Sequence, residues 1–127
     1  MEGGLEILLA EHVGYIKGKR VGFCCNHTAI DRHLKHGIDL LQAASVQLVR
    51  LFGPEHGVRA TAQDMVGVDE QRDPVTGIPC VSLYGDSAAS LYPSPESLSD
   101  LDVLLFDIQD IGSRYYTYQA TLGFIME

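Results

Sequence analysis

The sequence predicts a three-layer α/β domain with a mainly parallel sheet, and two observations support this prediction. Three short apolar runs, at residues 20–25, 46–52 and 101–107, contain few charges, which is typical of strands that are buried on both faces. The segments between the runs are long enough to hold the helices or crossovers that parallel strands require. We therefore expect the three runs to form parallel neighbours in one sheet.

Helices are expected before the first run and between the first two runs. Apolar residues recur at helical spacing over residues 5–16, and a second segment of this kind covers residues 36–44. Together with the two strands that flank it, the second helix gives a right-handed β-α-β unit. His33 and His36, near the start of this helix, are interpreted as surface residues.

The second half of the chain is less regular. Residues 57–79 contain glycines and prolines without sustained periodicity, which predicts a long loop of the kind that is often functional. Residues 79–85 indicate a short strand or extended segment. A short helical turn is expected after Ser94, which would cap it, with a proline at the first helical position. After the run at 101–107, a helix is expected to begin near Ser113 or Arg114 and to continue to the last residue.

The composition limits the classes of function. The chain has 127 residues and a formal net charge of −8, from 9 basic and 17 acidic residues, which argues against nucleic acid or an anionic membrane as the main partner. No apolar run approaches the roughly 20 residues of a membrane-spanning helix. The N-terminus lacks the features of a secretory signal, so the expected location is the cytoplasm. The three cysteines, two of them adjacent, are interpreted as buried free thiols of a protein in a reducing compartment. Their spacing lacks the C-x-x-C pattern typical of metal-binding cysteines.

The most informative segment is the sequence Gly-Pro-Glu-His-Gly at residues 53–57, directly after the second apolar run. Glycine and proline end the strand, so Glu55 and His56 are expected on a tight loop at the strand end. A carboxylate held there is a candidate general acid or base. The alternative is a structural carboxylate that caps or stabilises the loop. His56 would orient Glu55 or bind a substrate, or it would be a structural histidine.

Polar side chains also follow the other two predicted strands. Ligands of parallel α/β proteins bind outside the carboxyl ends of the strands, so we expect these groups along one edge of the sheet. Carboxylates, amides, a cation and aromatic rings together suit a small polyhydroxylated or acidic ligand. The candidate ligand-binding residues besides Glu55 are Asn26, His56, Asp107, Gln109, Asp110, Arg114 and Tyr115.

Several of these candidates have structural alternatives. Asp107 and Asp110 would serve equally well as caps of the following helix. Arg114 would form an ion pair with one of these two carboxylates. The tyrosines within residues 115–118 would pack in the core, with Tyr115 as the exception.

Five successive blocks of the sequence resemble a known family. They are residues 18–22, 51–57, 73–79, 82–85 and 106–118, and in this order they are similar to the DUF1343 family, which includes exo-acting β-N-acetylmuramidases of the NamZ type. The resemblance implies a Rossmann-like N-terminal domain, a smaller C-terminal domain, and a sugar in the cleft between them. It implies that Glu55 is a catalytic carboxylate. Arg114 would pair with the lactyl carboxylate of muramic acid, and we expect neither a cofactor nor a metal.

Two departures from the family pattern affect these expectations. The sequence Asn-His-Thr-Ala stands at residues 26–29, where family members typically have Asn-Pro-Thr-Gly. Family members are also much longer, so we expect residues 1–127 to be a truncated Rossmann-like N-terminal catalytic domain that ends inside an apolar helix.

These departures limit the activity that we expect. Glycoside hydrolysis generally uses two carboxyl groups, so we expect the chain alone to be inactive and its exposed last helix to favour self-association. The substrate would be a small sugar or muropeptide, and many family members are exported. The alternative function is a non-catalytic sugar-binding or interaction module.

Overall fold

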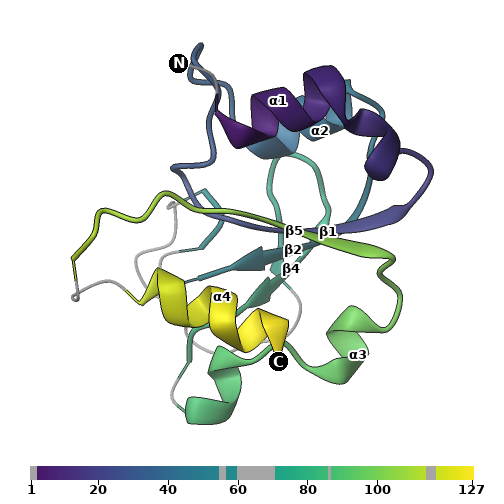
Figure 1. Ribbon diagram of the computed structural model, residues 1–127. Helices are drawn as coiled ribbons and strands as arrows, with labels where there is room; N and C mark the ends of the chain where they lie inside the picture. The colour runs from purple at the N-terminus through teal and green to yellow at the C-terminus, as the bar shows by residue number, and fades with distance from the viewer. Residues whose placement is uncertain (1–2, 55–56, 60–70, 86, 114–116) are drawn as a thin grey trace.

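A five-stranded sheet forms the middle layer of the computed structural model (Figure 1), which describes residues 3–54, 57–59, 71–85, 87–113 and 117–127. The strand order is β3-β4-β2-β1-β5. Four strands are parallel and β3 runs antiparallel to β4. The strands are β1 (Arg20–Cys25), β2 (Gln47–Gly53), β3 (Gln71–Arg72), β4 (Pro79–Ser82) and β5 (Val103–Asp107). The predicted α/β class with a mainly parallel sheet is confirmed, and the three runs found in the sequence are parallel neighbours.

Helices cover both faces of the sheet (Figure 1). On one face lie α1 (Gly4–Glu11) and α2 (Gly37–Ala43), and on the other lie α3 (Pro95–Leu98) and α4 (Tyr118–Met126). Two 3-10 turns, η1 (Val13–Tyr15) and η2 (Ala88–Leu91), connect the larger elements. Ser94 caps α3 as predicted, because its hydroxyl accepts a hydrogen bond from the backbone N–H of Ser97 at 3.1 Å.

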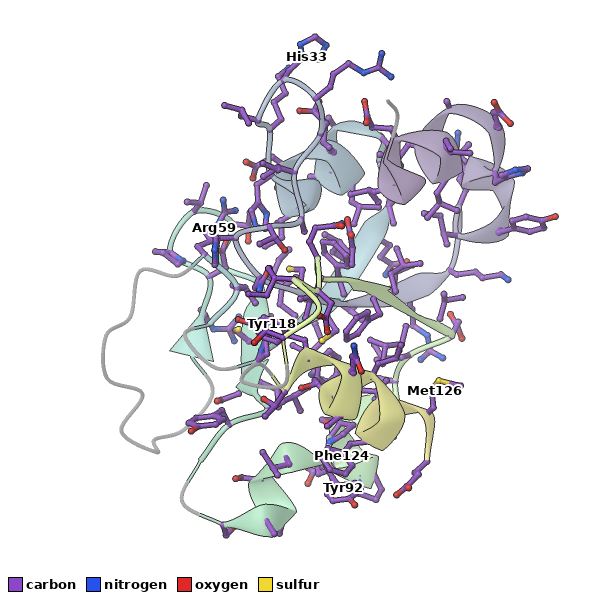
Figure 2. All side chains as sticks on the ribbon, turned by 60° about the vertical axis from the view of Figure 1, so that its left-hand side comes forward. His33, Arg59, Tyr92, Tyr118, Phe124 and Met126 are labelled. Carbon is purple, nitrogen blue, oxygen red and sulfur yellow. The ribbon has the colours of Figure 1, made fainter. Side chains whose placement is uncertain are left out.

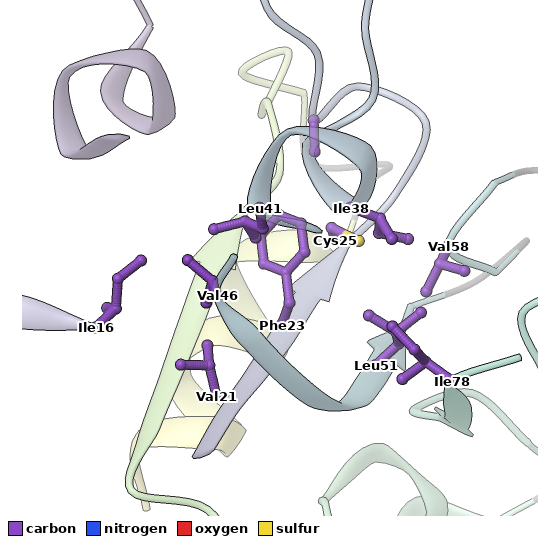
Figure 3. Close-up of a cluster of buried hydrophobic side chains, with 11 residues drawn as sticks. Ile16, Val21, Phe23, Cys25, Ile38, Leu41, Val46, Leu51, Val58 and Ile78 are labelled. Atoms are coloured by element: carbon purple, nitrogen blue, oxygen red, sulfur yellow. The ribbon is translucent and has the colours of Figure 1, made fainter. Parts of the chain in front are cut away.

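The two helical layers enclose two separate hydrophobic cores. Phe23, Ile38 and Leu41 are fully buried between the sheet and α2 (Figure 3). Phe52 and Leu83 are buried on the opposite face, beside half-buried leucines and Ile125 of α4. Burying such side chains is worth roughly 1.5–3 kcal/mol each, so both faces of the sheet contribute to stability.

The adjacent cysteines divide between these cores. Cys25 belongs to the core between the sheet and α2, and Cys24 belongs to the core on the opposite face of the sheet. This division arises because successive strand residues point to opposite faces. All three cysteines are free thiols. Burial raises the pKa of the Cys24 thiol to about 12 and that of the Cys80 thiol to about 11, so both stay protonated at neutral pH.

Both terminal helices differ from the prediction. The helix expected over residues 5–16 ends at Glu11, because His12 leaves helical geometry with φ −128° and a 3-10 turn follows; Gly14 disfavours a continued helix at this point. The helix expected from residue 113 or 114 begins at Tyr118. Thr117, which precedes this helix, adopts φ −99° and ψ 12°, outside helical geometry, so the helix starts only after it.

The third apolar run is less buried than its sequence indicates. β5 begins at Val103 and is half-buried along its whole length, because only β1 lies beside it. Asp102 precedes the strand in a turn, where its carboxylate accepts hydrogen bonds from the backbone and side chain of Arg20. The long loop predicted for residues 57–79 contains the short strand β3, and its residues 60–70 lie outside the described part of the chain.

Candidate functional site

The carboxyl ends of the four parallel strands meet along one edge of the sheet. Cys25, the last residue of β1, pairs with Asp107, the last residue of β5. Gly53, the last residue of β2, pairs with Ser82, the last residue of β4. Figure 2 brings forward the side of the molecule where the segments that follow the strands lie. Asn26, Asp107, Gln109 and Asp110 therefore lie at the edge where the sequence placed them.

Asn26 is the most buried polar residue of this edge. Asn26 as a whole is 1% exposed, and its Oδ1 accepts hydrogen bonds from the backbone N–H of Thr28 at 2.9 Å and from the Thr28 hydroxyl at 2.6 Å. Its Nδ2 has no hydrogen-bond partner among the described residues. A buried donor left unpaired costs about 1–3 kcal/mol, and a cost of this size in a native protein requires an explanation such as a functional role.

Thr28 connects Asn26 to the loop after β5. The same hydroxyl that donates to Asn26 accepts a hydrogen bond from the backbone N–H of Gln109 at 2.9 Å. The Gln109 side chain in turn donates from Nε2 to Asp107 Oδ1 at 3.2 Å. Thr28 was not among the site residues predicted from the sequence. Its separation by only two residues from Asn26 at a strand end was the available signal.

Asp107 and Asp110 differ in their surroundings. Burial raises the pKa of the Asp107 carboxyl, and the hydrogen bond from Gln109 only partly offsets this effect. Asp110 is exposed, and its Oδ1 accepts a hydrogen bond from the backbone N–H of Gly112 at 2.5 Å. Neither carboxylate caps the following helix, because α4 begins only after Thr117. The capping alternative is therefore wrong.

The interpretation of His36 as a surface residue is also wrong. His36 precedes α2, and its Nδ1 accepts a hydrogen bond from the backbone N–H of Ile38 at 3.2 Å. Its Nε2 lies 3.0 Å from the carbonyl oxygen of Asn26 and 3.2 Å from that of Val58. Both partners of Nε2 are acceptors, so Nε2 is the nitrogen that bears the hydrogen. His36 thus connects the loops that follow β1 and β2.

Glu55, His56, Arg114 and Tyr115 lie outside the described residues, so their proposed roles stay predictions. The residues around Glu55 and His56 are described. The backbone N–H of Gly57 donates to the carbonyl of Pro54 at 3.0 Å, and Gly57 adopts φ +77°. A Cβ atom at Gly53 would lie 3.1 Å from the Cα atom of Gly57. The chain therefore turns back immediately after β2, and both glycines are required for this geometry.

A buried ion pair follows this turn. The guanidinium of Arg59 donates to Asp73 through Nε at 2.6 Å and Nη2 at 3.2 Å, and Nη2 also donates to Asp39 Oδ1 at 3.0 Å. Burial alone would raise the pKa of the Asp73 carboxyl, but hydrogen bonds from Arg59 and Thr76 hold that pKa below its ordinary value. This pair fixes residues 57–59 against the turn at residues 73–78.

A depression of about 550 Å³ opens beside the edge. Its lining includes Thr28, Gln109, His27, Glu6, Asp31 and Arg32. A volume of this size is sufficient for a small ligand. In the described part of the chain, no cluster of three or more histidine, cysteine, aspartate or glutamate side chains could hold a metal ion. None of the described helices is long and apolar enough to span a membrane.

Comparison with known proteins gives consistent results. Residues 21–127 match the family described as "Exo-beta-N-acetylmuramidase NamZ, N-terminal". The chain is 41% identical over 128 residues to the "Peptidoglycan beta-N-acetylmuramidase NamZ" of Bacillus subtilis (strain 168), an alignment that covers 100% of this chain and 30% of that protein.

Two solved structures of DUF1343 family proteins from Bacteroides fragilis NCTC 9343 resemble the fold. One has a TM-score of 0.82 at 45% identity and covers 96% of this chain. The other has a TM-score of 0.74 at 32% identity and covers 97% of this chain. The chain spans only 29% and 30% of these two proteins.

Proposed function

The chain belongs to the NamZ exo-β-N-acetylmuramidase family, of which it matches the N-terminal part, and from this membership we propose that it forms one side of a site that removes terminal N-acetylmuramic acid from peptidoglycan fragments. Glu55 supplies one of the two carboxyl groups that glycoside hydrolysis generally uses. The observation that best supports this proposal is the close approach of Pro54 and Gly57 at the carboxyl end of β2, where the Gly57 N–H donates to the Pro54 carbonyl at 3.0 Å. Glu55 stands between these two residues in the sequence.

The strand order supports this position for the site. The parallel strands follow the order β4-β2-β1-β5, which corresponds to the order 3-2-1-4 of doubly wound dinucleotide-binding folds. On this basis we assign a Rossmann-like domain, although we propose no nucleotide and no other cofactor. Successive strands are added on one side of β1 up to β4 and on the other side at β5, so the strand order reverses between β1 and β5. Folds of this type bind ligands at the point of reversal. Asn26 follows β1 and Asp107 ends β5, one on each side of the change.

The polar residues of the edge have separate roles in this proposal. The amide of Asn26 and the side chains of Asp107 and Gln109 bind hydroxyl or acetamido groups of the sugar, and Asp110 binds at the periphery. His56 orients Glu55, and Tyr115 contacts the sugar. Arg114 pairs with the lactyl carboxylate of muramic acid, because its planar guanidinium matches a carboxylate with two hydrogen bonds.

Release of a single sugar from peptidoglycan fragments suits cell-wall recycling, and we propose this as the context of the activity. The three free thiols support a reducing compartment for this chain. Because the chain spans 30% of the Bacillus subtilis relative, the remaining carboxyl group and the opposite side of the cleft are assigned to parts of such proteins that this chain does not match.

A chimera provides the test. This chain replaces the matching segment of the Bacillus subtilis relative, and hydrolysis of a chromogenic N-acetylmuramide is measured. Glu55→Gln should lower kcat by about 10²–10⁴-fold, while binding of N-acetylmuramic acid is retained. Glu96→Gln, an exposed acid of α3, is the matched control and should leave kcat unchanged. Full turnover by the Glu55→Gln chimera would contradict the catalytic role of Glu55 and favour the non-catalytic sugar-binding alternative.

A further inference from the structure

Tyr84 is an exposed aromatic residue at the carboxyl end of β4. The strand ends at Ser82, and the side chain of Leu83 is buried in the core that contains Cys24 and Phe52. Leu83 is 2% exposed, whereas the next residue, Tyr84, is 45% exposed. Tyr84 therefore faces away from the core at the same edge of the sheet as Asn26 and Asp107.

Hydrogen bonds attach the backbone near Tyr84 to the end of β2. The backbone N–H of Leu83 donates to the carbonyl of Gly53 at 2.8 Å, two residues before Glu55. The Ser82 hydroxyl donates to the carbonyl of Tyr84 at 2.8 Å, and the backbone N–H of Tyr84 lies 3.2 Å from the same hydroxyl oxygen. The position of Tyr84 is thus fixed relative to the carboxyl end of β2.

The backbone after Tyr84 is also closely packed. A Cβ atom at Gly85 would lie 2.9 Å from the Ser90 hydroxyl oxygen, so this segment lies directly against η2. The ring of Tyr92 packs on Phe124, with centroids 4.4 Å apart. In the described part of the chain Tyr84 has no such ring partner, and 45% of this residue is exposed.

We propose that Tyr84 is the aromatic platform on which the pyranose ring of the sugar stacks, an inference that rests on the proposed function. One face of a pyranose consists of C–H groups that are apolar and weakly positive, and an aromatic face is apolar and negative. β4 and β1 are the two neighbours of β2 and so lie about 10 Å apart. A sugar ring placed at the carboxyl end of β2 is thereby flanked by Tyr84 on one side and Asn26 on the other.

The absence of tryptophan from the sequence makes a direct test simple. Tyr84→Trp introduces the sole indole of the 127-residue chain, and titration with N-acetylmuramic acid should change its emission. Tyr92→Trp is the matched control, because Tyr92 is similarly exposed at 42% but is already packed against Phe124. Its emission should stay constant over the same titration.

Affinity of the chimera described above, which contains both sides of the cleft, completes the test and is measured by calorimetry or ligand-observed NMR. Tyr84→Ala should weaken binding of N-acetylmuramic acid about tenfold, whereas Tyr84→Phe, which keeps the ring, should bind as the unsubstituted chimera does. Circular dichroism checks that each variant is folded. Unchanged affinity in Tyr84→Ala, or an equal loss in Tyr84→Phe, overturns the stacking role alone. If the unsubstituted chimera does not bind the sugar, the inference and the proposed function are overturned together.

Discussion

The backbone N–H of Gln109 donates to the hydroxyl oxygen of Thr28 at 2.9 Å, across 81 residues of sequence. The same hydroxyl donates to Asn26 at 2.6 Å, so one side chain links the loop after β1 to the loop after β5. These two loops contain the polar groups proposed to bind the sugar. One side-chain oxygen therefore joins two loops whose strands are already paired as far as Cys25 and Asp107.

Removal of this oxygen should loosen the edge. In Thr28→Val the side-chain shape is nearly unchanged, but Asn26 loses a donor and the Gln109 N–H loses its acceptor. The free energy of unfolding should fall by about 1–2 kcal/mol, as measured by urea denaturation. Thr28→Ser keeps the hydroxyl and should lose much less. Equal losses in the two variants would show that the methyl group, rather than the hydrogen bonds, stabilises this position.

The apolar runs were sufficient to predict the sheet, because strands buried on both faces need continuous apolar sequence. They did not show that β5 lies at an edge, since an edge strand and a central strand have the same local composition. The break after α1 was missed for a related reason. Residues 13 and 16 keep the apolar helical spacing, while the backbone there forms a 3-10 turn.

The Arg59–Asp73 pair should be one of the stronger polar contributions to stability. Asp73→Asn leaves the guanidinium of Arg59, whose side chain is 15% exposed, without its main partner. Breaking a buried pair typically costs about 3–5 kcal/mol, and we expect about 3 kcal/mol because Arg59 keeps its contact with Asp39. The measurement is the urea unfolding free energy at pH 7.

Asp102→Asn is the matched control for this pair. Asp102 also pairs with an arginine, Arg20, but both side chains are solvent-accessible, so the loss should be much smaller. If Asp102→Asn destabilised the chain as much as Asp73→Asn, burial would not be the reason for the strength of the Arg59 pair.

Self-association through α4 is the next prediction. Leu122 is 37% exposed and Met126 is 78% exposed on this helix, and exposed apolar side chains on one element favour contact between molecules. Sedimentation velocity should detect dimers that increase with protein concentration. The double substitution Leu122→Lys and Met126→Lys should remove them, because lysine keeps helix propensity while adding charge.

Leu34→Lys controls for the effect of added charge, because Leu34 is 77% exposed but lies in the loop before α2. It should leave the dimers intact. Dimers that persist in the α4 variant, or that disappear in Leu34→Lys, would assign the contact to another surface.

The candidate site was only partly predictable from the sequence. Asn26, Asp107 and Gln109 were selected because each follows a strand, and parallel strands bring their carboxyl ends together. His36 was missed because its partners, the carbonyls of Asn26 and Val58, are 10 and 22 residues away. Such contacts depend on how the loops fold back over the sheet, and no local pattern in the sequence records them.

Asp107 is expected to lower stability at neutral pH. Burial raises the pKa of its carboxyl in the folded protein, so the folded state holds this proton more tightly than the unfolded state does. The stabilisation associated with this group is therefore complete below the unfolded pKa of about 3.9 and is lost as pH rises through the folded pKa. At pH 7 the ionised carboxylate is less favourable in the fold than a neutral side chain of the same shape.

Asp107→Asn should accordingly raise the free energy of unfolding at pH 7, and the gain should shrink as pH falls below the unfolded pKa, where both side chains are neutral. Urea denaturation at pH 7 and at pH 3 measures the difference. Asp110→Asn removes a charge from the same loop at an exposed position, so it shows how much of the gain comes from the net charge of −8 alone. A gain that is equal at both pH values, or equal in both variants, would mean that burial of Asp107 is not its cause. A gain confined to Asp107 and to neutral pH would show that the fold keeps this carboxylate at the sheet edge in spite of its cost, as expected for a residue retained to bind substrate.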